Sequence, residues 1–180
     1  MQEIYTLNVA GLIRQLPVCK VNDTLSIAAF VMFSDVEITI KAAQELIKKS
    51  HDFDVIVTAE SKGIPLAYEM ARQTNKPYIL ARKNTKLYMK EPISVTVKSI
   101  TTSYTQTLYL DKSDTEFLAG KKVLIVDDVI STGESLKALE TLVKQVNGEI
   151  VGKCFVLAEG DAALRDDIIF LEELPLFFKK

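Results

Sequence analysis

The chain has 180 residues, 48% of them hydrophobic, and a formal net charge of -2 at pH 7. A chain of this size and apolar content can bury the core of one domain, and its weak charge disfavours nucleic acid as the main partner. Its two cysteines, Cys19 and Cys154, have neither disulfide nor metal spacing, and no apolar run is long enough to span a bilayer, so we expect a cytoplasmic protein without membrane contact.

The amino-terminal quarter predicts strands or turns followed by a helix. Residues 1–33 mix short apolar runs with Pro17 and show no clear period. Ser34 and Glu37 then resemble a capping box, which marks a helix start. Apolar residues follow at helical spacing, at Val36, Ile40, Ala43 and Ile47. This pattern predicts a helix from about 35 to 49 that packs on a sheet.

A strand, a polar turn and a helix follow in residues 54–71. The apolar run DVIVT predicts a buried strand at 54–58, and Ile64 begins a helical pattern. The turn between them consists of Glu60, Ser61, Lys62 and Gly63. Glycine permits a tight backbone, serine can donate a hydrogen bond and lysine supplies a cation. By itself the turn fits either a plain helix cap or an anion site at the edge of the sheet.

The next strand, at 77–81, leads into a basic segment. Four cations lie close together there: Arg82, Lys83, Lys86 and Lys90. Such runs are either solvated loops or sites for anions. Residues 92–110 alternate around a polar centre, which predicts a β-hairpin, and residues 111–120 form a polar connection.

The most informative stretch is VLIVDDVISTGES, at 123–135. Its four apolar residues predict a buried parallel strand that ends at Asp127 and Asp128, because adjacent carboxylates need hydroxyls, cations or water to face. The turn at 131–135 leads into a helix, and a helix start attracts anions. The apolar positions of that helix are Leu136, Leu139, Val143 and Val146. A phosphate cradle beside two carboxylates suits a phosphorylated sugar, which offers both a phosphate and hydroxyl groups.

The last part of the chain predicts two further strands. Residues 150–158 form a buried-strand pattern that is interrupted at 152–154, residues 159–161 form a turn, and a closing strand follows at 168–171. Strands that alternate with helices predict right-handed crossovers and a central parallel sheet, with ligands at its carboxyl edge. Neither GxGxxG nor GxxxxGK[ST] occurs, which argues against a dinucleotide enzyme and a nucleoside-triphosphatase.

Residues 123–135 resemble the phosphoribosyl-pyrophosphate signature of type I phosphoribosyltransferases: four apolar residues, two acids and a Thr-Gly turn. Residues 60–63 are similar to the adenine-type pyrophosphate loop of that family, with lysine where arginine is frequent. VLIVDD also opens response-regulator receiver domains, but near their amino terminus, whereas here it lies in the last third of the chain. An ordinary buried strand with a helix cap is the other alternative.

The resemblance implies an α/β fold with a central, mostly parallel sheet flanked by helices, a small hood and a flexible β-hairpin lid. It implies a single domain over residues 1–180, with 1–34 and 159–180 contributing to the hood. It also implies that Mg²⁺ is carried by the substrate pyrophosphate rather than by a dedicated protein site. The basic segment reaches the neighbouring subunit in some members of the family, which implies a homodimer.

The resemblance also assigns roles to individual residues. Asp127 and Asp128 are the catalytic acids that hold the ribose hydroxyls. The loop for the 5-phosphate consists of Ser131, Thr132, Gly133, Glu134 and Ser135. The pyrophosphate is assigned to Glu60, Ser61, Lys62, Gly63, Arg82, Lys83 and Lys86. Glu159 is assigned to the base pocket, and Glu91, Ser103 and Tyr104 are assigned to the lid.

The implied activity is the transfer of the phosphoribosyl group of phosphoribosyl pyrophosphate to a purine base. We place adenine first, because the turn at 158–161 lacks the lysine that xanthine-type relatives use to meet a base oxygen. Xanthine or another 6-oxopurine stays as an alternative, since the TVKSITTSYTQ stretch resembles a xanthine-type lid at least as well. A non-catalytic regulator that senses the sugar is a third reading, because ESKGIPLAYEMA resembles purine operon repressors; their winged DNA-binding domain would not fit in the first 34 residues.

Overall fold

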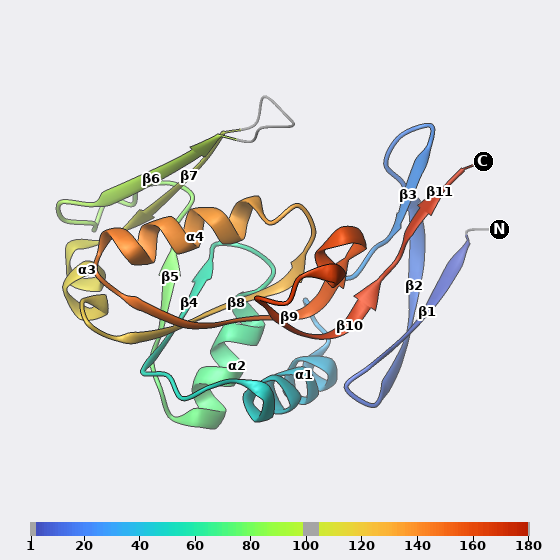
Figure 1. The fold of residues 1–180 in the computed structure, drawn as a ribbon, viewed down its shortest axis with the longest axis horizontal. Coiled ribbons are helices and arrows are strands. Elements are labelled where there is room, and N and C mark those ends of the chain that lie inside the picture. Colours follow the sequence, from blue (N-terminus) through green and yellow to red (C-terminus); the bar gives the residue numbers. More distant parts are fainter. Residues whose placement is uncertain (1–2, 99–104, 180) are drawn as a thin grey trace.

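The computed structural model describes residues 3–98 and 105–179, and its centre is a five-stranded parallel sheet (Figure 1). The strands lie in the order β10-β9-β8-β4-β5. Their bounds are Val55–Ala59 for β4, Tyr78–Ala81 for β5, Lys122–Ile130 for β8, Glu149–Glu159 for β9 and Ile169–Leu174 for β10. All five residues of β4 are buried, as expected for a parallel strand that is covered on both faces.

Helices cover the sheet on both sides. Helices α1 (Val36–Lys49) and α2 (Ile64–Thr74) pack on one face, where Leu46 and Met70 share a core cluster with β4 and β8. Helix α4 (Glu134–Gln145) packs on the other face, under the hairpin of β6 (Ile93–Lys98) and β7 (Thr105–Leu110) (Figure 1). The predicted α/β class with a parallel sheet flanked by helices is therefore confirmed.

A second, smaller sheet lies beside the carboxyl side of the main sheet and carries both ends of the described chain (Figure 1). We call it the hood. It consists of β1 (Ile4–Val9), β2 (Leu12–Lys20), β3 (Leu25–Ala28) and β11 (Leu176–Phe178), all paired antiparallel in that order. Leu7 of the hood is fully buried in the same core cluster as α1 and α2, so the two sheets share one core.

The strand order also fixes where a ligand can bind. From β4 the chain moves outward to β5, and from β8 it moves the other way to β9 and β10. In sheets of this type the loops after the two central strands diverge and leave a crevice at their carboxyl ends. The crevice here lies between the loop after β4 and the loop after β8.

Four local predictions need correction. Strand β8 does not end at the two acids but continues to Ile130, because its ladder with β9 still includes Asp127 opposite Phe155 and Val129 opposite Leu157. Residues 111–120 contain helix α3 (Lys112–Leu118), whose N-cap Asp111 accepts a hydrogen bond from the Lys112 amide at 2.9 Å. An N-cap aspartate was the signal for this helix.

The other two corrections concern β9 and the start of α1. Strand β9 is continuous, with only a register shift at Val151, where the pairing passes from Ile150 opposite Val123 to Gly152 opposite Leu124. A Cβ at Gly152 would lie 2.8 Å from Leu124 Cδ1, which explains the glycine there. The cap of α1 is Asp35 rather than Ser34, which adopts a φ of 68° outside the helix. The predicted turn at 159–161 opens a 3-10 helix, Gly160–Leu164.

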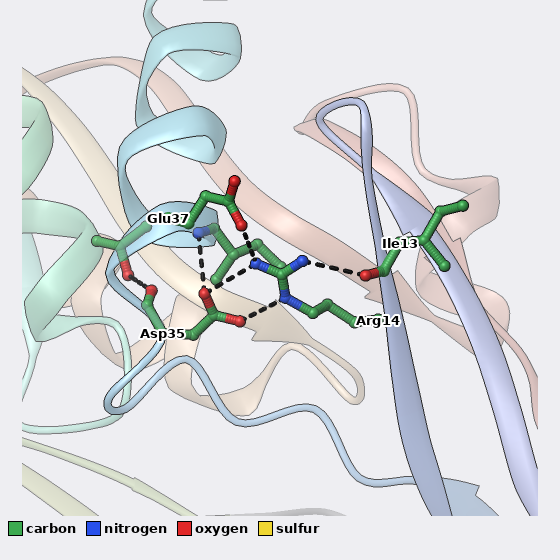
Figure 2. A network of polar contacts seen from close by, with 6 residues as sticks. Ile13, Arg14, Asp35 and Glu37 are labelled. Atoms are coloured by element: carbon green, nitrogen blue, oxygen red, sulfur yellow. Dashed lines mark hydrogen bonds and ion pairs between the residues drawn. The ribbon is translucent and has the colours of Figure 1, made fainter.

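An ion-pair network joins the hood to the first helix (Figure 2). Arg14 of β2 donates from Nε to Asp35 Oδ2 at 2.6 Å and from Nη2 to Glu37 Oε2 at 2.8 Å, and its Nη1 reaches the Ile13 carbonyl. The guanidinium holds the pKa of Asp35 below its usual value, chiefly through their hydrogen bond. Asp35 thus caps α1 and anchors the hood at once.

We expect Arg14→Met to lower the free energy of unfolding by about 1–2 kcal/mol near neutral pH, because Asp35 and Glu37 lose a forked, half-buried partner. Since the pKa of Asp35 is lowered in the folded state, this contribution is present above pH 4 or so and is lost as the pH falls through the folded value. Urea titrations at several pH values measure it. Lys20→Met, which removes an exposed pair with Asp23, is the control and should cost about 0.5 kcal/mol or less.

Within the described residues, no helix is long and apolar enough to cross a membrane.

Candidate active site

The two predicted acids lie at the end of β8, in the crevice, and both side chains are nearly inaccessible to solvent. Because successive side chains of a strand point to opposite faces, Asp127 and Asp128 diverge. Asp127 faces the α4 side of the sheet, where it lines a cavity with the loop after β8. Asp128 faces the hood and lines a different cavity with the segment that follows β3. The sequence pattern predicts two acids at one edge but not this division.

The loop after β4 holds Asp127 in place. Ser61 Oγ donates to Asp127 Oδ1 at 2.8 Å, and the same oxygen accepts from the amide of Asp128 at 3.0 Å. Gly63 lies against this carboxylate so closely that an added Cβ would come within 2.3 Å of Asp127 Oδ1 and 2.8 Å of Asp127 Cα. The glycine predicted for a tight backbone is therefore required by close contact between the two loops, since its φ of -72° is open to any residue.

The loop cavity, of about 150 Å³, lies beside the turn at 131–135. All five predicted phosphate residues line it: Ser131, Thr132, Gly133, Glu134 and Ser135. Gly133 adopts a left-handed conformation with φ 78°, which turns the chain into α4. The amino-terminal end of α4 is thus directed at the cavity, as in sites for anions. Arg165, which the sequence reasoning passed over, lies against this turn, because a Cβ at Gly133 would be 3.0 Å from its Nη1.

The hood cavity, of about 310 Å³, lies on the other side of the acids. Its walls come from Asp128 and Lys62, from the predicted base residue Glu159, from Leu174 and from residues 27–31, which run from the end of β3 into the segment before α1. The two cavities share Val129 and Ser131. Sequence reasoning missed residues 27–31, because an apolar run without a period gives no sign of which side chains face a ligand.

The basic segment gathers around Glu60. Arg82 Nη1 lies 3.3 Å and Lys86 Nζ 3.4 Å from Glu60 Oε1, and the amide of Lys83 donates to Glu60 Oε2 at 3.0 Å. These contacts lower the pKa of Glu60, with the hydrogen bond from the Lys83 amide as the main cause. Two of the cations predicted for a pyrophosphate, Arg82 and Lys86, thus share Glu60 as an internal counterion at the end of β5.

Lys62 has different partners. Its Nζ donates to the carbonyl oxygen of Phe30 at 3.2 Å and lies 3.4 Å from Asp128 Oδ2. Asp128 Oδ2 is buried and accepts no hydrogen bond from any residue that the structure describes. Lys62 is therefore directed at the hood cavity rather than at the cluster around Glu60.

The predicted lid residues are not brought to the acids by the described part of the chain. Glu91 lies just before β6, with a φ of 44°, and forms an exposed ion pair with Lys112 of α3 at 2.7 Å. Ser103 and Tyr104 lie outside the described residues. Their assignment to a lid stays a prediction.

Burial raises the pKa of Asp127 from its ordinary value of 3.8 to about 7, and the nearby charge of Asp128 adds to the effect. The hydrogen bond from Ser61 opposes it. Near neutral pH the Asp127 carboxyl is therefore partly protonated in the free protein. A neutral Asp127 reduces the repulsion that a phosphate in the loop cavity would otherwise meet.

We expect Asp127→Asn to stabilise the ligand-free protein at about pH 8 by about 2 to 4 kcal/mol. A carboxyl whose pKa is raised on folding contributes its stability below the unfolded value of 3.8, and this stability is lost as the pH rises towards 7. Asparagine does not titrate, so the stability of the variant lacks this pH dependence. Urea titrations between about pH 4 and pH 8 should show the two proteins converging at the acid end; a constant difference would contradict the shift.

Comparisons with known proteins agree with this geometry. Residues 33–175 match the phosphoribosyl transferase domain family. An adenine phosphoribosyltransferase of Agathobacter rectalis is 34% identical over 137 residues, which cover 71% of this chain and 75% of that protein. The purine biosynthesis transcriptional repressor PurR of Bacillus subtilis is 33% identical over 122 residues, 67% of this chain but only 42% of the repressor.

Solved structures show the same fold. The adenine phosphoribosyltransferase of Thermoanaerobacter pseudethanolicus superposes with a TM-score of 0.64 at 24% identity, over 77% of this chain and 80% of that one. The Saccharomyces cerevisiae enzyme, solved with adenine and an imino-altritol bisphosphate, gives a TM-score of 0.61 at 25% identity, over 75% and 77% of the two chains.

The fold and the match over most of its length place this chain in the phosphoribosyltransferase family, to which it belongs. The relatives named here are an adenine phosphoribosyltransferase from each of three organisms and a purine biosynthesis repressor.

Proposed function

We propose that the chain transfers the phosphoribosyl group of phosphoribosyl pyrophosphate to adenine and releases pyrophosphate and adenosine monophosphate. The observation that supports this best is the pair of cavities that meet at Val129 and Ser131 with an acid facing each. One cavity is lined by a helix start and small hydroxyl residues, and the other by a largely apolar wall. A molecule with a phosphate, a sugar and a base fits this arrangement, with the phosphate in the first cavity, the sugar at the two acids and the base in the second cavity.

Different residues of the site bind different parts of the substrate. The turn at 131–135 and the start of α4 bind the 5-phosphate, through hydroxyl groups and the helix dipole. Asp128, whose Oδ2 has an unused acceptor position among the described residues, accepts from a ribose hydroxyl. Asp127, fixed by Ser61, faces the sugar from the phosphate side. Arg82 and Lys86 exchange their ion pairs with Glu60 for contacts to the pyrophosphate, and the exposed Lys83 adds a third cation.

The reaction breaks the bond between the ribose carbon and the pyrophosphate oxygen and forms a bond from that carbon to a base nitrogen. The ribose gains positive charge in the transition state, so a buried carboxylate beside it is stabilising in proportion to that charge. The cations of the basic segment stabilise the negative charge on the departing pyrophosphate. The adjoining cavities also hold both substrates in fixed positions next to each other, and this proximity further lowers the activation barrier.

Magnesium fits this site as an ion that arrives with the substrate. No cluster of three His, Cys, Asp or Glu side chains that could hold a metal occurs in the described ranges 3–98 and 105–179. Mg²⁺ commonly binds through one or two carboxylates together with substrate phosphates, and Asp128 Oδ2 offers such an oxygen at the site. When bound, the ion would offset the charge of the pyrophosphate.

Adenine is the preferred base because the similar enzymes named above act on it, which confirms the choice predicted from the sequence. Glu159, at the edge of the hood cavity, can accept a hydrogen bond from an exocyclic amine. The similarity to a transcriptional repressor keeps a sugar-sensing role as a second candidate, but the chain spans less than half of that protein.

We further propose a homodimer and a cytoplasmic location. The basic segment exposes Leu87 completely and Tyr88 by 64%, and a second subunit would cover both. Cys19 and Cys154 are both free, in keeping with a reducing compartment. Size-exclusion chromatography with light scattering tests the dimer.

The decisive assay follows pyrophosphate release from phosphoribosyl pyrophosphate and Mg²⁺ with adenine, hypoxanthine, guanine, xanthine or orotate. Turnover with adenine alone supports the proposal. Turnover with a 6-oxopurine instead would reassign the base, and tight binding of the sugar without turnover on any base would favour the sensor.

A further inference from the structure

Lys62 occupies a position that its place in the pyrophosphate loop does not predict. Its neighbours Ser61 and Gly63 contact Asp127, and Glu60 contacts the basic segment. Lys62 alone extends across the loop to the hood side, where it lines the hood cavity. The loop therefore divides its side chains between two regions of the crevice.

The ammonium of Lys62 joins two walls of the hood cavity. One is Asp128, whose side chain is only 6% exposed, at 3.4 Å from Oδ2. The other is the backbone of the segment between β3 and α1, through the Phe30 carbonyl at 3.2 Å. A buried carboxylate is costly unless a cation or donors lie near it, and Lys62 is the cation that the structure places there.

The segment that Lys62 holds is also anchored at its far end. Asp35, which follows it, is bound by Arg14 of the hood (Figure 2). Phe30 and Met32 are buried in the core, and Phe30 also lines the cavity together with Ala29 and Val31. The wall of the cavity is therefore a short stretch fixed by Lys62 at one end and by the Arg14 pair at the other.

We propose that Lys62 is a positioning residue for the nucleotide side of the site, acting through Asp128 and the Phe30 carbonyl, and not a ligand of the pyrophosphate. This inference rests on the proposed function. It predicts that loss of the ammonium lowers the affinity for ligands that contain ribose and base and leaves the affinity for pyrophosphate unchanged.

Two ligands separate the alternatives. Adenosine monophosphate occupies the phosphate loop, the acids and the hood cavity but lacks the pyrophosphate. Inorganic pyrophosphate with Mg²⁺ occupies the basic segment and lacks ribose and base. The dissociation constant of each ligand is measured by calorimetry on the wild type, on Lys62→Met and on Lys83→Met, which removes an exposed cation next to the Glu60 cluster.

We expect Lys62→Met to raise the dissociation constant of adenosine monophosphate about 10-fold or more, since one charge-assisted contact is lost on the nucleotide side only. The dissociation constant of pyrophosphate should change less than about 2-fold. Lys83→Met should show the opposite pattern. Lys62→Arg, which keeps the charge, should restore adenosine monophosphate binding to within about 3-fold of the wild type. In steady-state assays, Lys62→Met should raise the KM for adenine more than the KM for phosphoribosyl pyrophosphate.

Loss of pyrophosphate affinity in Lys62→Met with adenosine monophosphate binding unchanged would overturn the inference and leave the proposed function standing. An equal loss of affinity for both ligands in Lys62→Met, with no recovery in Lys62→Arg, would also overturn it, because Lys62 would then act on the whole loop. A wild-type chain that binds neither ligand would overturn the proposed function and the inference with it.

Discussion

The double substitution Asp127→Asn and Asp128→Asn should abolish turnover while the fold stays intact. Asparagine keeps the size of each side chain and an acceptor oxygen, so the contact from Ser61 is retained in kind. It removes the negative charge that opposes the positive charge on the ribose in the transition state. We expect kcat/KM to fall by about a thousand-fold or more. Of the single variants, Asp128→Asn should lose more, because its Oδ2 has an unused acceptor position and Asp127 is braced within the loop.

The control changes the same charge elsewhere. Asp23 and Asp52 are exposed acids whose ion pairs among the described residues are with Lys20 and Lys76, outside the crevice, so Asp23→Asn with Asp52→Asn should leave turnover within about 2-fold. Circular dichroism and thermal melting verify that each double variant is folded. A folded Asp127→Asn, Asp128→Asn protein that turns over adenine normally would show that the ribose contacts have been misassigned.

Gly63→Ala should be the most damaging of the glycine-to-alanine substitutions, because the added Cβ makes the shortest contact found at any of the seven glycines. The new Cβ would lie 2.3 Å from Asp127 Oδ1 and 2.8 Å from Asp127 Cα, and the second of these atoms is backbone in a central strand. Relief requires the loop after β4 to move away from β8, which separates Ser61 from Asp127. We expect kcat/KM to fall about 100-fold or more and stability to fall by about 1–3 kcal/mol.

Gly120→Ala distinguishes this steric effect from a general cost of losing glycine. Gly120 has a φ of 71° in the turn before β8, and a Cβ added there would have no described neighbour within 4 Å. Alanine there should cost about 1 kcal/mol of stability through backbone strain, with kcat/KM unchanged at a temperature where the protein is folded. If Gly63→Ala behaved like Gly120→Ala, the close approach of the two loops would not matter for activity.

The parts of this fold that the sequence predicts are those governed by local pattern. Continuous apolar runs predict β4 and β8, because a strand that is buried on both faces needs apolar residues at successive positions. Helical spacing predicts α1, because a helix that is buried along one stripe needs apolar residues every three or four positions. The hood is different. Its strand β3 pairs with β11 from the other end of the chain, and no local pattern records such a partner.

The candidate site shows the same limit. The acids and the turn at 131–135 can be named from sequence because strand, carboxylates and helix start follow one another directly. The direction of Lys62 cannot, since it depends on where Phe30 and Asp128 lie in space. The prediction that β8 ends at its acids was wrong for a related reason: a polar residue ends a strand only when no neighbouring strand continues the ladder, and β9 does continue it.

The pairing of β3 with β11 has a consequence for how the molecule folds. Residues 176–178 are the last described strand to be synthesised, and they pair with Leu25–Ile27 near the other end of the chain. Contacts between such distant segments form slowly, because the intervening loop must be closed first. The four-stranded hood can therefore be completed only after residues 176–178 have been made, whereas β1 and β2 can pair as soon as both are free to fold.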